Sequence, residues 1–293
     1  MKVVFSNSLR QTRHTIAAPI LQRYQPDPAL AELVHYVWTL RTETDEPQAF
    51  PDLLVPDGYA ELIFVRSGGY VKQFVHTPEQ STMITQSVLL PIRTRSQLVR
   101  RLEPVDLIGI KLKPTALFQL LRRNDLLATG EALSERTTPW LHELETSLST
   151  DYADEDALRI IRQHFLQQLL EHEPLPRLGL IHEVLHLIDE HAGVVALQEV
   201  VRELPIGVRQ FQRYFKQYVG ITAKQYANIV RFKHYYRNHI VDELKTVDYF
   251  DAGYFDQAHF IRDFKKYLGT TPSNVQTESF RAVHRMARIS RKK

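Results

Sequence analysis

The sequence predicts an α+β protein of two domains, in which a β-rich N-terminal domain with flanking helices precedes an all-α C-terminal domain. Its 293 residues exceed what one hydrophobic core usually organises. Between Leu33 and Leu112, β-branched and aromatic segments alternate with turn residues, whereas after Pro176 the apolar spacing is wholly helical. Residues 1–177 hold 19 Lys and Arg against 22 Asp and Glu, and the rest holds 18 against 12. The basic second half is therefore the candidate for a polyanionic partner.

The N-terminal half contains a series of segments typical of β-strands. One of them follows a Pro-Asp-Gly turn at residues 56–58, which supports a strand start there. We expect strands over Leu33–Leu40, Tyr59–Arg66, Met83–Leu90, Gln97–Leu102 and Val105–Leu112.

Helices are expected to follow these strands. Pro114 stands where a helix can start, and Ala116–Arg123 has helical character. Leu126–Leu148 reads as helical or loop-like, and the apolar spacing of Asp154–Glu171 predicts an amphipathic helix. The sequence Glu173-Pro174-Leu175-Pro176 ends that helix and marks a domain boundary.

We therefore divide the chain into four parts. They are a β-rich effector-sensing or dimerisation domain over residues 1–135, a helical linker over 136–176, an all-α domain over 177–278 and a basic tail over 279–293. The tail is as consistent with phosphate contact as with disorder.

The composition excludes several classes of function. The chain has no cysteine, which removes disulfides, thiol nucleophiles and thiolate metal sites. It contains neither an apolar run of about 18 residues nor a secretory signal, so we expect no membrane association and a cytoplasmic location. No Gly-rich phosphate loop and no Gly-x-Ser-x-Gly motif occurs. We expect no cofactor and no enzymatic activity.

Two helix-turn-helix units are predicted in the all-α domain. In the first, Leu197, Val200, Val201 and Leu204 form the apolar face of a short helix, and a break at Leu204–Gly207 follows. The next helix is expected to bury Val208, Phe211, Phe215 and Val219. Its opposite side then carries only donors and cations, namely Arg209, Gln210, Gln212, Arg213, Lys216 and Gln217. Arg and Gln side chains can form paired hydrogen bonds with base edges, and Lys side chains bind phosphates. This pattern therefore favours a helix that reads bases in the major groove of DNA.

The same arrangement occurs a second time. Thr246–Ala252 is expected to be a short helix ended by Gly253, and Asp256 can cap a helix that runs to about Tyr267. Ala223–His239 is expected to form one longer helix between the units. Phe260 and Phe264 are expected on the buried side of the second reading helix. The side chains expected on its exposed side are Gln257, His259, Arg262 and Lys266. Both reading helices end in a Lys-x-Tyr-x-Gly segment, which supports a repeat.

These segments resemble the DNA-binding domain of the AraC/XylS family of transcription regulators. The resemblance covers residues 178–278 and is most specific from Ala252 to Phe264 (Ala-Gly-Tyr-Phe-Asp-Gln-Ala-His-Phe-Ile-Arg-Asp-Phe) and over Gly269-Thr270-Thr271-Pro272. It implies that two second helices enter successive major-groove segments of double-stranded DNA. By position, the resemblance implies base contacts from Arg209, Gln212, Arg213, Gln257, His259 and Arg262. On the same exposed faces, Lys216 and Lys266 are also expected to bind DNA.

Residues 20–135 resemble, more weakly, an uncharacterised N-terminal domain found on some regulators of this family. The matching pieces are Tyr36-Val37-Trp38, Pro56-Asp57-Gly58 with Glu61–Phe64, and Gly109–Pro114. The resemblance implies a role in sensing a small-molecule effector or in forming a homodimer, and it supplies no ligand. For His35, Trp38, Asp57 and Glu61 we favour strand ends and turn residues over a pocket lining.

Several residues depart from the family pattern. Val201 and Tyr249 stand where a small residue is usual, and Asp248 replaces an apolar one. In the first turn, Pro205 stands where Gly is common, so this turn is expected to be built differently, whereas Gly207 in place of the usual Ser is a mild change.

His182-Glu183-Val184-Leu185-His186 matches the His-Glu-x-x-His pattern of zinc metalloproteases. The segment is also a helix whose apolar stripe is Leu178, Ile181, Val184, Leu185 and Ile188, which leaves His182, His186 and Asp189 toward solvent. We therefore favour surface histidines over a metal site, and a sequence-specific DNA-binding transcription regulator over an enzyme. The alternative is a protein-interaction or ligand-binding module that keeps a degenerate helix-turn-helix domain.

Overall fold

The computed structural model of the chain describes residues 20–42, 48, 51–123, 125–126, 131–132, 139–148, 153–241, 253–254 and 256–272. The predictions for Thr246–Ala252, for Asp248 and Tyr249, and for the tail over 279–293 lie outside these residues. No helix in the described part is both long and apolar enough to cross a bilayer.

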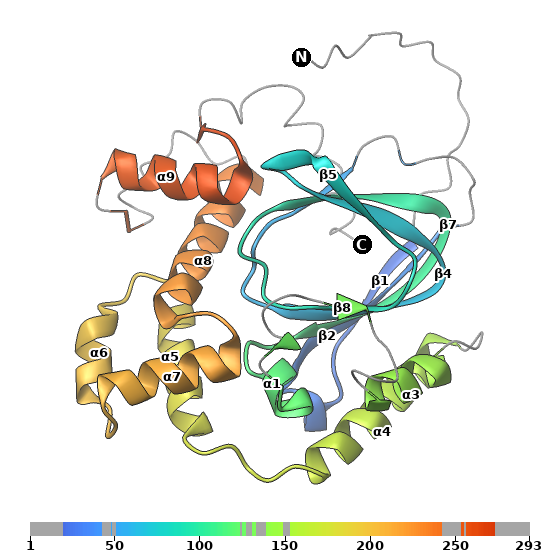
Figure 1. The fold of residues 1–293 in the computed structure, drawn as a ribbon, viewed down its shortest axis with the longest axis horizontal. Coiled ribbons are helices and arrows are strands. Elements are labelled where there is room, and N and C mark those ends of the chain that lie inside the picture. The colour runs from blue at the N-terminus through green and yellow to red at the C-terminus, as the bar shows by residue number, and fades with distance from the viewer. Residues whose placement is uncertain are drawn as a thin grey trace, which may run out of the picture.

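The N-terminal part is one strongly curled antiparallel sheet (Figure 1). Its main path runs in the order β1-β2-β7-β4-β6-β8, while β3 pairs with β7 and β5 pairs with β4. The strands are β1 (Ile20–Tyr24), β2 (Val34–Arg41), β3 (Asp52–Leu54), β4 (Ala60–Phe74), β5 (Thr77–Ile84), β6 (Val88–Leu90), β7 (Gln97–Leu112) and β8 (Glu131–Ala132).

Two long strands, β4 and β7, create the curl because they pair along most of their length and bend together. The register of the pair shifts on both sides of Ser67, as at a β-bulge. Gly68 follows with a φ of +71°, and a Cβ atom there would lie 2.2 Å from the carbonyl oxygen of Pro104. Only glycine fits this bend. The predicted strand end at Arg66 and the predicted break at Glu103–Pro104 were therefore wrong, because β4 and β7 continue through these positions.

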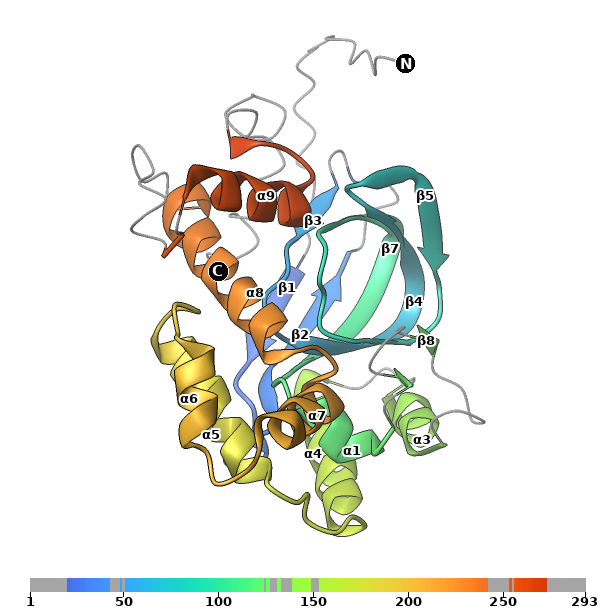
Figure 2. The ribbon, with the colours of Figure 1, turned by 60° about the vertical axis from the view of Figure 1, so that its left-hand side comes forward.

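Helices cover the convex face of the sheet (Figures 1 and 2). They are η1 (Pro28–Leu30), α1 (Ala116–Leu121), α3 (Pro139–Leu148) and α4 (Asp154–Leu170). Asp154 accepts hydrogen bonds from Tyr24, Thr39 and Arg41, and Arg162 pairs with Asp27 at 2.8 Å. The described residues between 136 and 176, which we expected to form a linker, thus pack against the N-terminal domain.

The C-terminal part is helical, as predicted. Its helices are α5 (Leu178–Glu190), α6 (Leu197–Glu203), α7 (Val208–Val219), α8 (Ala223–Tyr235), the π-helix η2 (Tyr236–Val241) and α9 (Gln257–Leu268). The long connecting helix is confirmed, although its last turn is a π-helix. Leu204 has extended backbone before Pro205, at φ −70° and ψ 144°, so the first turn forms without a left-handed residue.

The two parts share one hydrophobic core. It joins Phe64 and Ile108 on the convex side of the sheet to Ile181, Phe215 and Phe232 of the helical part. A smaller apolar cluster lies on the concave side of the sheet and includes Leu40, Ile63, Tyr70, Val88, Val105 and Leu107. Successive residues of each strand point to opposite faces of the sheet, and both faces carry large apolar side chains.

Candidate nucleic-acid interface

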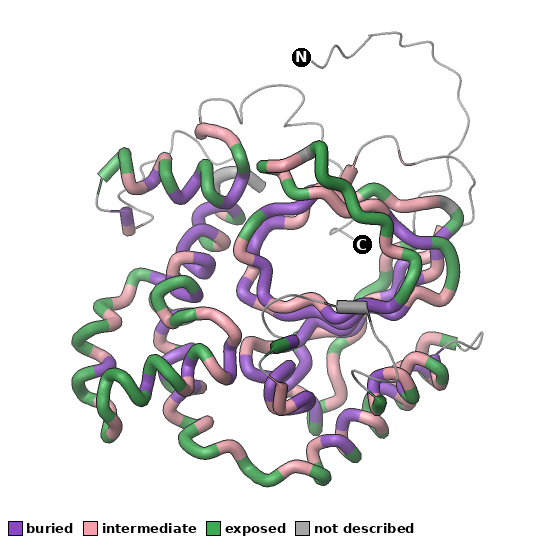
Figure 3. The backbone as a smooth tube through the Cα atoms, in the orientation of Figure 1, coloured by how far each residue is buried: buried purple, intermediate pink, exposed green. Residues whose placement is uncertain are grey.

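The first reading helix, α7, presents a polar face to solvent. Phe211, Phe215 and Tyr218 are buried on its inner side. The outer side of the helix is exposed, as the green segments of Figure 3 show, and carries Arg209, Gln210, Gln212, Arg213 and Lys216. Gly207 caps the helix with extended backbone and no side-chain hydrogen bond. The expected separation of donors from aromatics is confirmed, apart from one residue.

That residue is Val208, which we expected to be buried. Its side chain lies at the first turn of α7 and remains 45% exposed. Val208 shares the helix face of Phe211 and Phe215, but it is the first residue of α7, so its side chain stands at the open end of that face. The exposed start of α7 therefore carries one apolar group next to Arg209.

The second reading helix, α9, repeats the design of α7. Asp256 caps it by accepting a hydrogen bond from the backbone N–H of His259 at 2.6 Å, as predicted. Phe260 and Phe264 are buried, and Gln257, Arg262, Lys265 and Lys266 are exposed. Both helices end at a left-handed glycine whose N–H donates to a lysine carbonyl at 2.9 Å, in the pairs Gly220–Lys216 and Gly269–Lys265.

His259 differs from the other predicted contacts because its ring has partners within the protein. Its Nε2 atom lies 3.4 Å from Nη2 of Arg231 and 3.8 Å from Oδ2 of Asp263, and its ring packs edge-on against Tyr254. The side chain is about one third exposed. Its assignment as a DNA contact stays a prediction, and the structure gives it a second role at the junction of α8 and α9.

Arg231 on α8 organises that junction. It forms an ion pair with Asp263 of α9 at 3.2 Å, reaches the carbonyl oxygen of Gly253 at 3.4 Å, and stacks over the ring of Tyr254. Both ion-pair side chains are about one tenth exposed. This pair was not predicted, although Asp263 next to the buried Phe264 is a polar residue that would need a partner.

Both reading helices also contact the N-terminal part. Tyr218 of α7 stacks on Phe118 of α1, with ring centroids 5.2 Å apart. At the far end of α9, the N–H of Ser96 donates to the carbonyl oxygen of Tyr267 at 3.3 Å, and His76 reaches the carbonyl oxygen of Lys266 at 2.8 Å. Figure 2 shows α8 and α9 beside the sheet. The N-terminal part thus contacts α7 through α1 and α9 through two segments that connect strands.

The His-Glu-x-x-His segment lies on α5, and its two histidines have different surroundings. His186 is exposed and pairs with Glu190, as expected for the surface. His182 is half-buried and shares a hydrogen bond of 2.9 Å with the hydroxyl of Thr115, so its expected place toward solvent was wrong. Asp189 accepts from the hydroxyl of Tyr226 at 3.3 Å. Within the described residues, no group of three or more His, Asp and Glu side chains is arranged to hold a metal ion.

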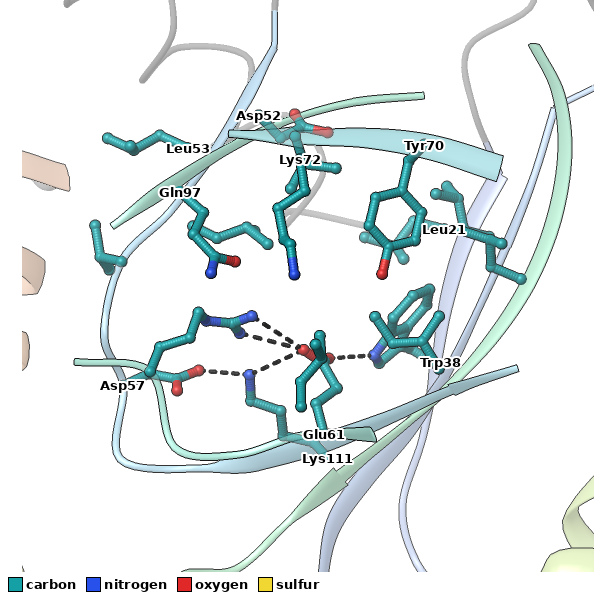
Figure 4. A pocket seen from close by; sticks show the side chains of 18 of the residues that line it. Leu21, Trp38, Asp52, Leu53, Asp57, Glu61, Tyr70, Lys72, Gln97 and Lys111 are labelled. Carbon is teal, nitrogen blue, oxygen red and sulfur yellow. Dashed lines mark hydrogen bonds and ion pairs between the residues drawn. The ribbon is translucent and has the colours of Figure 1, made fainter. Parts of the chain in front are cut away.

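A cavity of about 220 Å³ lies on the concave side of the sheet (Figure 4). Trp38, Asp57 and Glu61 line it. Our preference for strand ends and turn residues over a pocket lining was therefore wrong for these three residues. His35 does not line it; its ring stacks on Tyr59 at 4.4 Å. The pattern alone could not reveal the cavity, because it forms only where distant strands curl around a common space.

A network of charges lies along the wall of this cavity. Glu61 accepts from Trp38 at 2.9 Å and pairs with Arg93 at 3.2 Å, and Lys111 lies 2.6 Å from Asp57 and 3.7 Å from Glu61. Burial alone would raise the pKa of Asp57, but Lys111 and Arg93 hold that pKa below its ordinary value.

The charge network extends to the helical part through α8. Lys233 places its ammonium group over the ring of Tyr59 at 4.4 Å, and its charge contributes to the lowered pKa of Asp57. Next to it, Gly58 in the turn before β4 lies against the ring of Tyr226. The cavity wall and the helix between the two reading helices are therefore connected by direct contacts.

Comparisons with known proteins identify the two parts of the chain separately. A family model described as a helix-turn-helix domain, of the AraC type, matches residues 200–278. A second model, described as a domain of unknown function (DUF6597), matches residues 22–128. A search of curated proteins found no match.

Among solved structures, the chain is similar to ToxT from Vibrio cholerae O395, with 14% identity and a TM-score of 0.40 over 87% of this chain and 96% of that one. A structure of wild-type ToxT from Vibrio cholerae strain SCE256 with bound unsaturated fatty acid has 13% identity and a TM-score of 0.38, over 90% and 96%. The AraC-like transcriptional activator CuxR has 14% identity and a TM-score of 0.29, over 74% and 86%.

Proposed function

We propose that this chain, which carries an AraC-type helix-turn-helix domain behind a DUF6597 domain, is a transcription regulator that reads two major-groove segments of double-stranded DNA with α7 and α9. The observation that carries the proposal is the shared design of these two helices. Each has a buried aromatic face, an exposed face of Arg, Gln and Lys, and the same glycine cap. A basic C-terminal half supports the same function.

We assign two roles to the exposed side chains. Arg209, Gln212 and Arg213 on α7, and Gln257 and Arg262 on α9, contact base edges, because Arg and Gln make paired hydrogen bonds with guanine and adenine. Lys216 and Lys266 stand near the helix ends and neutralise phosphates. Arg213 and Arg262 are the most informative positions, because both are exposed and lie at the middle of their helices.

Val208 adds an apolar contact to this interface. It is the first residue of α7, and the first turn of a recognition helix is the part nearest to the bases. An exposed valine there is suited to the C5-methyl group of thymine. We propose that Val208 selects an A·T pair beside the bases that Arg209 and Gln212 read.

Control of DNA binding is assigned to the N-terminal part, through a small-molecule effector or through a homodimer. The packing of Phe118 on Tyr218 and of Lys233 on Tyr59 supports this assignment, because movement in the sheet would reach the helices that read DNA. Catalysis has no place in this function, and the cytoplasm is the compartment where a regulator of this kind meets DNA.

The test is a selection of bound fragments from random double-stranded DNA by the purified full-length protein, followed by titrations across a salt series. The proposal predicts an enriched motif that spans two adjacent major-groove segments. Arg213→Ala and Arg262→Ala should each weaken binding to it by about 1–3 kcal/mol. Arg159→Ala on α4 is the matched control, because that arginine is 69% exposed on another part of the molecule.

Weak binding with a steep salt dependence and no motif would contradict this function. It would favour the alternative, in which the helix-turn-helix domain is degenerate and the chain acts through protein or ligand binding. Sedimentation equilibrium of the same protein, with and without the enriched site, would decide whether it binds as a dimer.

A further inference from the structure

The cavity on the concave side of the sheet carries an unbalanced positive charge. Four ionic groups on its wall, Glu61, Asp57, Arg93 and Lys111, neutralise one another. Arg101 pairs with Asp52 at 2.7 Å, and Arg23 is exposed and stacks on the ring of Tyr36. Lys72 on β4 also lines the cavity and has neither an ion pair nor a hydrogen bond within the part of the chain that the structure describes.

Lys72 points into this cavity (Figure 4). Burial lowers the pKa of its amino group, and the nearby charge of Arg93 lowers it further. Lys72 on β4 and Arg93 between β6 and β7 face a common space, and two such cations repel each other unless an anion lies between them. The ion pairs among Glu61, Asp57, Arg93 and Lys111 form without Lys72. No described side chain supplies an anionic partner for the amino group of Lys72.

Two further polar groups, the hydroxyl of Tyr70 and the amide of Gln97, face the same space as Lys72. Tyr70 is 3% exposed, and its buried hydroxyl has no hydrogen-bond partner among the described residues. Gln97 is 7% exposed and points into the same space from β7. A buried hydroxyl without a partner costs free energy, and such groups are expected to meet a ligand or an ordered water.

Apart from Arg23 and Tyr36, the rest of the cavity is apolar. Leu21, Leu40, Ile63 and Leu107 form part of its wall, and Trp38 lies beside Glu61. The volume of about 220 Å³ is below the range of ~300–1,000 Å³ typical of sites for drug-sized ligands. A sugar or other polyol would leave most of its hydroxyl groups against leucine and isoleucine, whereas a small apolar body with one polar end matches the wall.

We propose that this cavity binds a small monocarboxylate with an apolar body, whose carboxylate meets Lys72, Tyr70 and Gln97 and whose body packs on Trp38 and the aliphatic wall. One partly buried cation without an ion pair among the described residues, one hydroxyl donor and one amide match a monoanion with two oxygen atoms better than a phosphate dianion. Arg23, the other lining cation without such a pair, is exposed and stacks on the ring of Tyr36. The effector role of this ligand rests on the proposed function, but its binding does not.

The binding test uses the fluorescence of Trp38. The chain has two tryptophans, and Trp140 packs against Phe165, away from the cavity lining. In a Trp140→Phe protein, Trp38 is the only tryptophan and reports directly on the cavity. The probes are phenylacetate, benzoate and cyclohexanecarboxylate, each compared with its uncharged amide, in the absence of DNA.

We expect at least one carboxylate to change the emission of Trp38 with an affinity about tenfold or more above that of its amide, as a charged hydrogen bond implies. Lys72→Met should remove this preference, and Lys72→Arg should retain it within a few-fold. The melting temperature of the unliganded Lys72→Met protein should equal or exceed that of its parent, because an unpaired, half-buried cation is lost. Lys224→Met, at an exposed position on α8, is the control.

Equal affinity for carboxylates and amides, an unchanged preference in Lys72→Met, or no binding by any probe at about 10 mM would each overturn the proposal. Because the titration contains no DNA, a failure here leaves the DNA-reading function untouched. Conversely, a protein that selects no DNA motif can still show the carboxylate preference.

Discussion

Arg231 on α8 and Asp263 on α9 form a buried ion pair, with 3.2 Å between Nη2 and Oδ2, that joins the second reading helix to the connecting helix. Each side chain is about one tenth exposed. Arg231 also contacts Asn228, Gly253 and Tyr254, so that one guanidinium group fixes three segments. The position of α9 relative to α7 therefore depends on this pair.

Removing one partner should destabilise the protein strongly. Arg231→Met leaves the Asp263 carboxylate buried without its cation, and such changes cost about 3–5 kcal/mol. Chemical denaturation followed by circular dichroism measures the loss. Arg159→Met is the control, because it breaks an exposed pair with Asp156 and should change the free energy of unfolding by less than about 0.5 kcal/mol. Equal effects of the two variants would show that the Arg231 pair is not structural.

Gly109 on β7 is expected to be intolerant of any side chain. Trp38 on β2 lies directly across it, and a Cβ atom at Gly109 would lie 1.9 Å from Cε2 of the indole. Gly109→Ala should therefore displace Trp38, break its hydrogen bond to Glu61 and cost about 3 kcal/mol or more. In a Trp38→Ala background the same change should cost less than about 1 kcal/mol. A cost that is the same in both backgrounds would place the strain elsewhere.

Mild acid should weaken the packing between the two parts of the chain. Burial lowers the pKa of His182, which bonds to Thr115 across this junction, below its ordinary 6.5. The unfolded chain then binds a proton more readily than the folded one, so stability is lost as the pH falls from about 6.5 through the folded pKa. Melting temperatures measured from pH 7.5 to 5.5 should fall less steeply for His182→Gln than for the parent protein.

The exposed His186 on the same helix provides the comparison. His186→Gln should leave the slope of melting temperature against pH close to that of the parent. If His182→Gln does so as well, the buried histidine is not the source of the acid sensitivity.

The apolar contact assigned to Val208 can be tested on the DNA instead of the protein. Replacing each thymine of the selected site by deoxyuridine removes one methyl group, and a methyl-sized apolar contact is worth about 0.8 kcal/mol. We expect one position in the first half-site at which this change weakens binding about three- to fourfold. In Val208→Ala that position should no longer respond, and a response that is unchanged would remove Val208 from the interface.

The sequence predicted the helical part better than the sheet, for physical reasons. Helical periodicity is local, so Phe211 and Phe215 identified the buried face of α7 and Asp256 identified the cap of α9. Val208 lies on the predicted face but remains exposed, because the spacing does not show that the core ends before the first turn of α7. The ends of the strands were obscured by Gly68, which reads as a turn but allows β4 to bend and continue.

Contacts between residues that are far apart in the sequence could not be predicted from its pattern. The cavity residues Trp38, Glu61 and Lys72 come from two strands that meet only through the curl of the sheet. The partner of His182 is Thr115, 67 positions away, so its place at the junction has no local signal. Contacts of this kind depend on how two separately predictable parts pack together.

The most direct test of the central claim is a loss-of-contact analysis on the selected DNA site, in which affinities for every single base-pair change are measured for the parent, Arg213→Ala and Arg262→Ala proteins. If α7 and α9 read adjacent major-groove segments, each variant should become indifferent to base identity at one position, and the two positions should lie in different segments. If both variants weaken binding uniformly while keeping the parent's preference at every position, the two arginines contact only phosphates, and the claim that these helices read bases is contradicted.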